Sequence, residues 1–227
     1  MFPRLVAREV RARVSVPGSR SIAILNKGAR IRGAKRDPAS YMKNASGLQY
    51  SAAKAPECQD KVRNAFKFAD YGVQLSDSLI LQCLTHKSFA HGSVPYNEKL
   101  QLLGTQFLKL RATLFSLHEG GNAANASTGN INGLDFAALG SPRSKTLVSR
   151  RNIGQTVKRA DIDDVVFWKM RDVEKGGKYN GEDTVLSSVL SALVGAILTT
   201  NGPEVAATYV DKFLLGEGSS LSLVKDI

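Results

Sequence analysis

The stretch Leu84-Thr-His-Lys-Ser-Phe-Ala90, followed by Tyr96-Asn-Glu-Lys-Leu-Gln-Leu-Leu-Gly-Thr-Gln-Phe-Leu108, decides the fold of this chain. From Leu100 onward, apolar residues recur at alternating spacings of three and four, which is the period of one face of an α-helix. We expect that face to be buried in the core. It consists of Leu100, Leu103, Phe107, Leu110, Leu114 and Leu117.

A different side of the same predicted helix carries Glu98, Gln101 and Thr105, which are three and four residues apart and therefore project to one place. A functional site would be built on such a side. A second apolar stretch, 183–198, carries small residues at helical spacing, which allow another helix to approach closely. These small residues are Ser188, Ser191 or Ala192, and Gly195.

Both stretches resemble the signature helices of ribonuclease III. The first resembles the pattern Asn-Glu-Arg-Leu-Glu-Phe-Leu-Gly-Asp, preceded by a Leu-Thr-His-Arg-Ser helix end, and the second resembles Leu-Ala-Asp-Thr-Val-Glu-Ala-Leu-Ile-Gly. The resemblance implies an all-α, ribonuclease III endonuclease-like helical domain with a basic, irregular N-terminal extension. Matching residues are His86, Lys87, Ser88, Asn97, Glu98, Lys99, Leu100, Leu103 and Gly104, then Val189, Ala192, Leu193 and Gly195.

The resemblance also places the family's metal-binding carboxylates on four neutral residues of this chain. These residues are Gln101, Thr105, Ser188 and Ser191, whereas Glu98 alone matches an acid. Mg²⁺ prefers charged oxygen ligands, and two-metal cleavage of a phosphodiester needs several carboxylates. The sequence therefore predicts no catalytic residue, no metal and no cofactor, and we expect a protein that is not an enzyme.

Positive charge is concentrated at the N-terminus. Residues 1–54 hold twelve Lys or Arg and two acidic residues, while the whole chain has a net charge of +11. Residues 1–21 are Arg-rich and amphipathic, which is typical of a mitochondrial targeting segment, and the sequence leaves its removal open. Residues 22–55 contain little apolar surface and are either a solvated linker or, as we favour, an arm that binds RNA phosphates.

A second basic run precedes Asp161, on a helix that we expect Asn152 to cap. Such a run is either a solvated face or a site of RNA phosphate contact. The predicted RNA-binding residues of the arm and of this run are Arg30, Arg32, Lys35, Arg36, Arg143, Lys145, Arg150, Arg151, Lys158 and Arg159.

The folded domain is predicted to span 56–216, with a Gly- and Asn-rich loop insertion at 118–142 and a C-terminal tail at 217–227. Its core is expected to include Val165, Val166, Phe167 and Trp168, and Gly202-Pro203 is expected to begin a new helix. Cys58 and Cys83 are predicted to be free thiols in a reducing compartment, and we expect no membrane span.

The family pairs through its signature helices, so the resemblance implies a dimer interface at Gln101, Leu102, Thr105 and Gln106. The basic arm and the neutral site together resemble ribonuclease III-like proteins of the large subunit of the fungal mitochondrial ribosome. The expected role is therefore a structural constituent of that subunit in the mitochondrial matrix. Its expected partners are rRNA and other ribosomal proteins, with a second ribonuclease III-like protein favoured over self-pairing. The alternative is a mitochondrial ribonuclease that processes double-stranded RNA, or an RNA-maturation factor.

Overall fold

The computed structural model describes residues 42–122, 130–131, 134–135, 139–172 and 174–226. The regular secondary structure of the described residues is almost entirely helical, as the sequence predicted. Its helices are α2 (Pro56–Ala65), α3 (Asp77–Leu84), α4 (Glu98–Asn122), α5 (Pro142–Leu147), α6 (Arg150–Arg159) and α7 (Glu182–Tyr209). Single helical turns lie at Ala52–Lys54, Phe68–Tyr71, Phe89–Gly92, Asp163–Val165, Val210–Leu214 and Leu223–Asp226.

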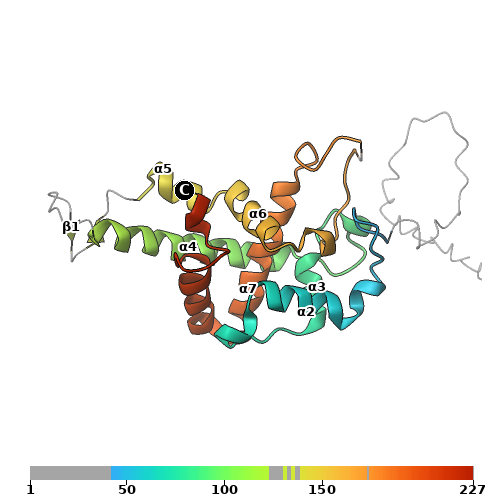
Figure 1. Cartoon of the computed structure of the whole chain (residues 1–227), viewed down its shortest axis with the longest axis horizontal. Helices are drawn as coiled ribbons and strands as arrows, with labels where there is room; N and C mark the ends of the chain where they lie inside the picture. The colour runs from blue at the N-terminus through green and yellow to red at the C-terminus, as the bar shows by residue number, and fades with distance from the viewer. Residues whose placement is uncertain (1–41, 123–129, 132–133, 136–138, 173, 227) are drawn as a thin grey trace, which may run out of the picture. The chain divides into compact units, whose positions relative to one another are not determined.

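Two helices, α4 and α7, form the centre of the domain, with α6 packed against α7 (Figure 1). The middle of α7 is buried from Val185 to Ile197, including the polar Ser188 and Ser191. The sequence predicted a break at Gly202-Pro203, and the structure confirms it: Gly202 has φ 85° and ψ 170°, so α7 has two helical parts. A π-helical turn, Val210–Leu214, continues the second part.

The closest approach of α4 and α7 is a contact between their backbones. A Cβ atom added at Gly104 would lie 1.7 Å from the carbonyl oxygen of Ser191, and one added at Gly195 would lie 2.1 Å from that of Leu100. Only glycine fits at either position, because any side chain would push the helices apart. The predicted close approach of a helix to the small residues of 183–198 is therefore confirmed.

This contact selects a different core face of α4 from the one that the sequence predicted. The residues buried against α7 are Gly104, Leu108 and Ala112, whereas Leu103 and Leu110 are 47% and 55% exposed. The prediction for these two leucines was wrong because close backbone approach, rather than side-chain size, decides which face turns inward. Leu100 and Phe107 are half-buried at the edge of the core, and Leu117 is buried.

The segment before α2 also packs on the domain. Tyr50 and Ala53 join a second buried cluster with Phe89 and Phe167, and the ring of Tyr50 lies 5.2 Å from that of Phe167. Val165, Val166, Phe167 and Trp168 are all buried, as the sequence predicted. Cys83 is buried, Cys58 is half-buried, and both are free thiols.

Three local predictions differ from the structure or lie outside the part described. Helix α4 continues to Asn122 instead of ending near Leu117, and a two-residue hairpin pairs β1 (Asn130–Ile131) with β2 (Leu134–Asp135) inside the predicted insertion. Ser149, not Asn152, caps α6 by accepting a hydrogen bond from the amide of Asn152. Segment 1–21 and the arm residues Arg30, Arg32, Lys35 and Arg36 lie outside the described residues.

By length and composition, one helix among the described residues, Glu182–Leu214, could cross a membrane. However, 72% of its apolar window is buried inside the domain. Burial of this kind is what a core helix requires, because its apolar surface is removed from water by the other helices.

The Gly104 contact leads to a stability prediction. Alanine normally stabilises a helix relative to glycine, but Gly104→Ala places a methyl group against the backbone of Ser191. We expect a loss of about 3 kcal/mol in the free energy of unfolding, at the upper end of the usual cost of overpacking. Gly176→Ala is the matched control because nothing lies within 4 Å of its added Cβ. Equal unfolding midpoints for the two variants in urea would contradict the proposed contact.

Candidate nucleic-acid interface

The α4–α7 contact brings the family's signature positions together. Asn97 is fully buried just before α4 and donates from Nδ2 to the Cys83 carbonyl oxygen and to Ser188 Oγ, at 3.1 Å each. Ser188 Oγ donates in turn to the Val185 carbonyl oxygen at 2.6 Å. Gln101 lies one helical turn after Asn97, on the side of α4 that faces α7. Positions far apart in sequence therefore converge on one place.

The side chains at this place do not fit a divalent metal ion held by carboxylates. Ser188 and Ser191 are buried hydroxyls, and Gln101 and Thr105 are half-buried neutral residues. Glu98 supplies a carboxylate, but its Oε1 lies 2.7 Å from Nζ of Lys87, and both side chains are more than half exposed. Among the described residues, no group of three His, Cys, Asp or Glu could hold a metal ion.

His86 joins the end of α3 to the segment after Val166. Its amide donates to the Phe167 carbonyl oxygen at 2.8 Å, and its Nδ1 lies 2.9 Å from Ser88 Oγ. Ser88 Oγ also accepts from the amide of Lys169 at 3.1 Å. Burial lowers the pKa of His86, and the nearby charge of Glu98 opposes this shift. A neutral imidazole within this network of backbone contacts gives His86 a structural role at the end of α3.

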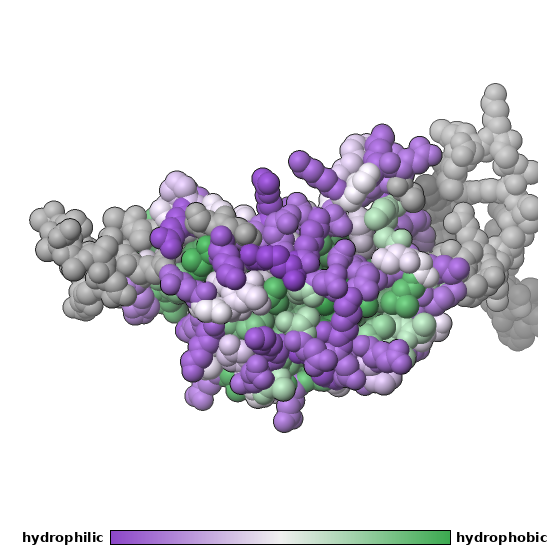
Figure 2. Space-filling view, in the orientation of Figure 1, coloured by the Kyte–Doolittle hydropathy of each residue, from purple (hydrophilic) through white to green (hydrophobic). Residues whose placement is uncertain are grey.

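The predicted basic residues of α5 and α6 lie on two consecutive short helices. Arg143 and Lys145 are exposed on α5, and Arg150 and Arg151 are exposed in the first turn of α6. Neither helix has an acidic residue in its first turn. In the orientation of Figure 1, hydrophilic side chains dominate the surface in the region of these helices (Figure 2).

Two of the predicted RNA-binding residues have partners within the domain. Lys158 Nζ lies 2.6 Å from Glu182 Oε2 and 3.8 Å from Asp183 Oδ1, and hydrogen bonding to Glu182 is the main cause that raises the pKa of Lys158. Arg159 donates to Thr156 Oγ1 at 2.9 Å and to the Ser222 carbonyl oxygen at 3.0 Å. Arg159 nevertheless remains exposed, as do Arg150 and Arg151 in the first turn of α6, whereas Lys158 is half-buried.

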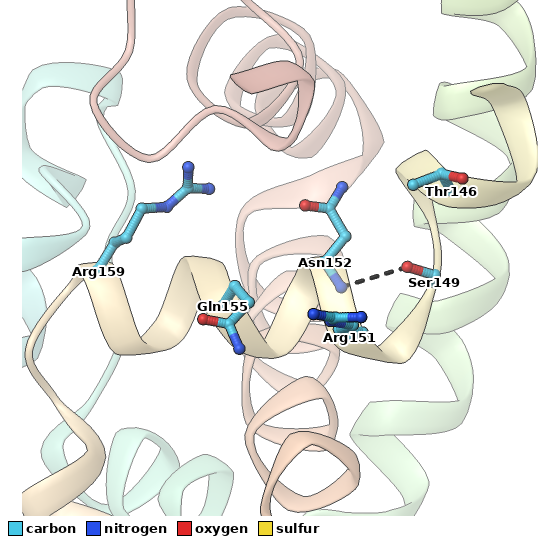
Figure 3. Close-up of a pocket in the computed structure, with 6 residues that line it drawn as sticks. All are labelled: Thr146, Ser149, Arg151, Asn152, Gln155 and Arg159. Carbon is cyan, nitrogen blue, oxygen red and sulfur yellow. Dashed lines mark hydrogen bonds between the residues drawn. The ribbon is translucent and has the colours of Figure 1, made fainter. Parts of the chain in front are cut away.

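A polar pocket of about 590 Å³ lies along α6 (Figure 3). Arg159 lies at one end and Thr146 at the other, while the Asn152 amide extends on the same side of the helix as Arg159. Asn152 Nδ2 donates to the carbonyl oxygens of Leu147 and Leu223, so the C-terminal segment is held against this helix. The lining residues are Thr146, Ser149, Arg151, Asn152, Gln155 and Arg159.

The residues predicted for a dimer interface fall on two sides of α4. Gln101 and Thr105 are half-buried beside α7, whereas Leu102 and Gln106 are exposed on the side turned away from it. Leu102 is 64% exposed, and Leu103 and Leu110 extend the same exposed side. The periodicity of these last two leucines with Leu100 is that of a core face, so the sequence gives no signal that they lie at the surface.

These features define a helical domain of the ribonuclease III class. Residues 76–217 match the family model described as Ribonuclease-III-like. The chain therefore belongs to the ribonuclease-III-like family, and the fold and family predictions are confirmed.

Several bacterial proteins are similar to this chain in sequence. Ribonuclease 3 of Corynebacterium efficiens is 26% identical over 158 residues, which cover 68% of this chain and 58% of that protein. Ribonuclease 3 of Thermobifida fusca is 26% identical over 170 residues, covering 73% and 60%, and that of Mycobacterium leprae is 31% identical over 149 residues, covering 62% and 55%. This chain thus spans less than two thirds of the length of these relatives.

Two solved structures of the nuclease domain of ribonuclease III from Campylobacter jejuni resemble this one. The first has a TM-score of 0.49 and 23% identity, and covers 67% of this chain and 90% of the other. The second has a TM-score of 0.48 and 21% identity, and covers 72% of this chain and 96% of the other. Its description refers to structural flexibility in a region involved in dimer formation.

The expectation that this protein is not an enzyme is contradicted, because the relatives carry the name of an enzyme, Ribonuclease 3. The physical reason is that four neutral side chains show only that the family's carboxylate ligands are missing at those positions. The four are Gln101, Thr105, Ser188 and Ser191. Catalytic groups are identified by their geometry around a substrate and can come from other positions.

Proposed function

We propose that this chain is an RNA-binding structural constituent of the mitochondrial large ribosomal subunit. In this proposal, the exposed basic residues of α5 and α6 contact rRNA phosphates, and the exposed side of α4 binds a second ribonuclease III-like domain. The observation that carries the RNA-binding part is the placement of Arg143, Arg150 and Arg151 in the first turns of two helices.

Helix electrostatics explain why that placement favours a bound polyanion. The N-terminus of a helix carries partial positive charge, so cations there are unfavourable and anions favourable. Helix α6 nevertheless begins with Arg150 and Arg151 and has no acid in its first turn. A phosphate group bound at this end would interact favourably with both the guanidinium groups and the helix dipole. Arg143 in the first turn of α5 adds a further exposed cation close by in the sequence.

The exposed side of α4 supports the protein-partner part of the proposal. Leu102 and Leu110 are two helical turns apart, with Gln106 between them, and Leu103 lies beside them. These three leucines form an apolar surface on one helix, and a bound partner would bury that surface away from water. A related domain with its own signature helix has the shape to pack along this side.

The mitochondrial part of the proposal rests on the sequence of residues 1–54, where the excess positive charge lies. A basic segment with few acids favours both import into mitochondria and attachment to rRNA. A second candidate function is a ribonuclease that processes double-stranded RNA, which the names of the relatives favour.

Sedimentation of mitochondrial extracts separates the two candidates. A ribosomal constituent will co-sediment with the large subunit through gradients of moderate salt. Recovery of the chain only in slowly sedimenting fractions would contradict the proposal. Cleavage of double-stranded RNA with Mg²⁺ or Mn²⁺ by those fractions, absent when the chain is depleted, would support the second candidate.

The basic residues of α6 provide a quantitative test. The double variant Arg150→Ala/Arg151→Ala should bind RNA more weakly, and the slope of log K against log salt should become shallower by about two, one for each lost phosphate contact. Fluorescence anisotropy with labelled rRNA fragments at several salt concentrations measures both. Lys212→Ala removes one exposed cation outside α5 and α6, and we expect a change in slope well below half that of the double variant. A change of half that size would indicate that the charge acts without a defined site.

The α4 surface provides an independent test. Leu110→Glu places a charge in the exposed apolar side, and burying that charge at an interface is costly, so we expect loss of the partner domain from complexes purified through a tag on this chain. Thr208→Glu adds the same charge at an exposed position of α7 and should retain the partner. Retention of the partner by Leu110→Glu, with unchanged thermal stability, would contradict the assignment of this side.

A further inference from the structure

The connection between Trp168 and α7 is a surface loop held closed by one side chain. Asn180 Oδ1 accepts from the amide of Asp172 at 2.8 Å, and Asn180 Nδ2 donates to the Asp172 carbonyl oxygen at 2.7 Å. The same Nδ2 also donates to the carbonyl oxygens of Lys175 and Gly176. These contacts fix the backbone of the loop from both directions before any ligand binds. We call residues 169–172 and 174–181 the Tyr179 loop.

An aromatic ring is presented to solvent by this loop. Tyr179 is 62% exposed, and Nζ of Lys175 lies 4.6 Å from the centroid of its ring. The amide of Tyr179 donates to the Gly176 carbonyl oxygen at 3.2 Å, which fixes the residue within the turn. A cation over the ring is favourable by itself, and most of the side chain still contacts water. The turn therefore exposes aromatic surface beside the Lys175 ammonium group.

The charged residues of the Tyr179 loop are mostly positive. Lys169, Arg171 and Lys178 are exposed, and the structure shows no ion pair for any of them among the residues it describes. Lys175 is 3.4 Å from Asp172, so one of the two acids of the loop is already paired. Backbone phosphates on either side of a stacked base would meet these cations.

We propose that the Tyr179 loop is a binding site for single-stranded RNA, in which an unpaired base stacks on Tyr179 and the flanking phosphates contact Lys169, Arg171 and Lys178. An unpaired base has an exposed π-face that stacks on a tyrosine ring, and this stacking tolerates any base. In a duplex, both faces of each base are covered by its neighbours, so the site selects loops, bulges and ends. This proposal rests on the proposed RNA-binding function and names a second class of RNA contact, separate from α5 and α6.

The composition of the loop argues against a protein as the ligand. Protein interfaces are built around clustered apolar and aromatic groups from which charged residues are depleted. Among the described residues of this loop, Tyr179 is the single large apolar side chain that is exposed, and Lys175 lies against its ring. An isolated ring among cations is the arrangement found where proteins bind single-stranded nucleic acids.

Binding of two labelled RNAs to the full chain tests this site. Fluorescence anisotropy compares a twelve-nucleotide single strand with the twelve-base-pair duplex that contains it. Tyr179→Ala should weaken single-strand binding roughly 5- to 100-fold, the range for loss of one stacked base, and leave duplex binding unchanged. Tyr179→Phe keeps the ring and should bind as the unaltered chain does. Lys178→Ala should make the single-strand salt slope shallower by about 0.7.

The outcomes separate this proposal from the proposed function. Single-strand binding that is unchanged by Tyr179→Ala, with duplex binding intact, overturns the stacking site and leaves RNA binding by α5 and α6 standing. Equal weakening of both RNAs also overturns it, because a duplex offers no free base. Failure of the unaltered chain to bind either RNA overturns both proposals. Thermal unfolding at an unchanged midpoint shows that each variant is folded, as expected for an exposed residue.

Discussion

The contact between the backbones of α4 and α7 is the constraint on which the rest of this domain depends. Gly104 and Gly195 each lie where any Cβ atom would collide with the facing helix. The two helices therefore meet at a separation that only glycine allows, and dispersion contacts along both are gained at that distance. Most of α7 is buried as a result, and the other helices pack around it.

That contact also determines which surfaces face outward. Turning Gly104, Leu108 and Ala112 toward α7 leaves Leu102 and Leu110 on the opposite side of α4. Helix α6 packs on α7, so its first turn, with Arg150 and Arg151, remains at the surface. The Tyr179 loop leads directly into α7 and is fixed by Asn180. One helix crossing thus positions an exposed apolar side of α4 and two exposed basic surfaces.

The sequence predicted those features that depend on local chemistry. The break at Gly202-Pro203 and the buried run of Val165 to Trp168 follow from backbone restriction and apolar burial, and the structure confirms both. The small residues of α7 predicted a close helix contact because small side chains allow the backbone of another helix to approach. The four neutral signature positions could be read directly, but they did not decide whether the protein is an enzyme.

Features that depend on tertiary contacts could not be predicted in this way. The exposure of Leu103 and Leu110 follows from the rotation of α4 about its axis, which Gly104 and its partner on α7 determine together. Ser149 caps α6, because the side-chain amide of Asn152 instead donates to the Leu223 carbonyl oxygen and binds the C-terminal segment. The exposed ring of Tyr179 depends on the Asn180 contacts, and its sequence, beside two glycines, indicates only a turn.

Native-state hydrogen exchange tests the central role of the α4–α7 crossing most directly. Amides of α4 near Leu108 and of α7 between Ser188 and Ile197 should exchange only through global unfolding, with a free energy equal to that from urea denaturation. Amides of α5 should exchange through smaller openings. Exchange in the centre of α7 at a lower free energy than in α2 or α6 would contradict the account, because the crossing would then open while the surrounding helices stayed folded.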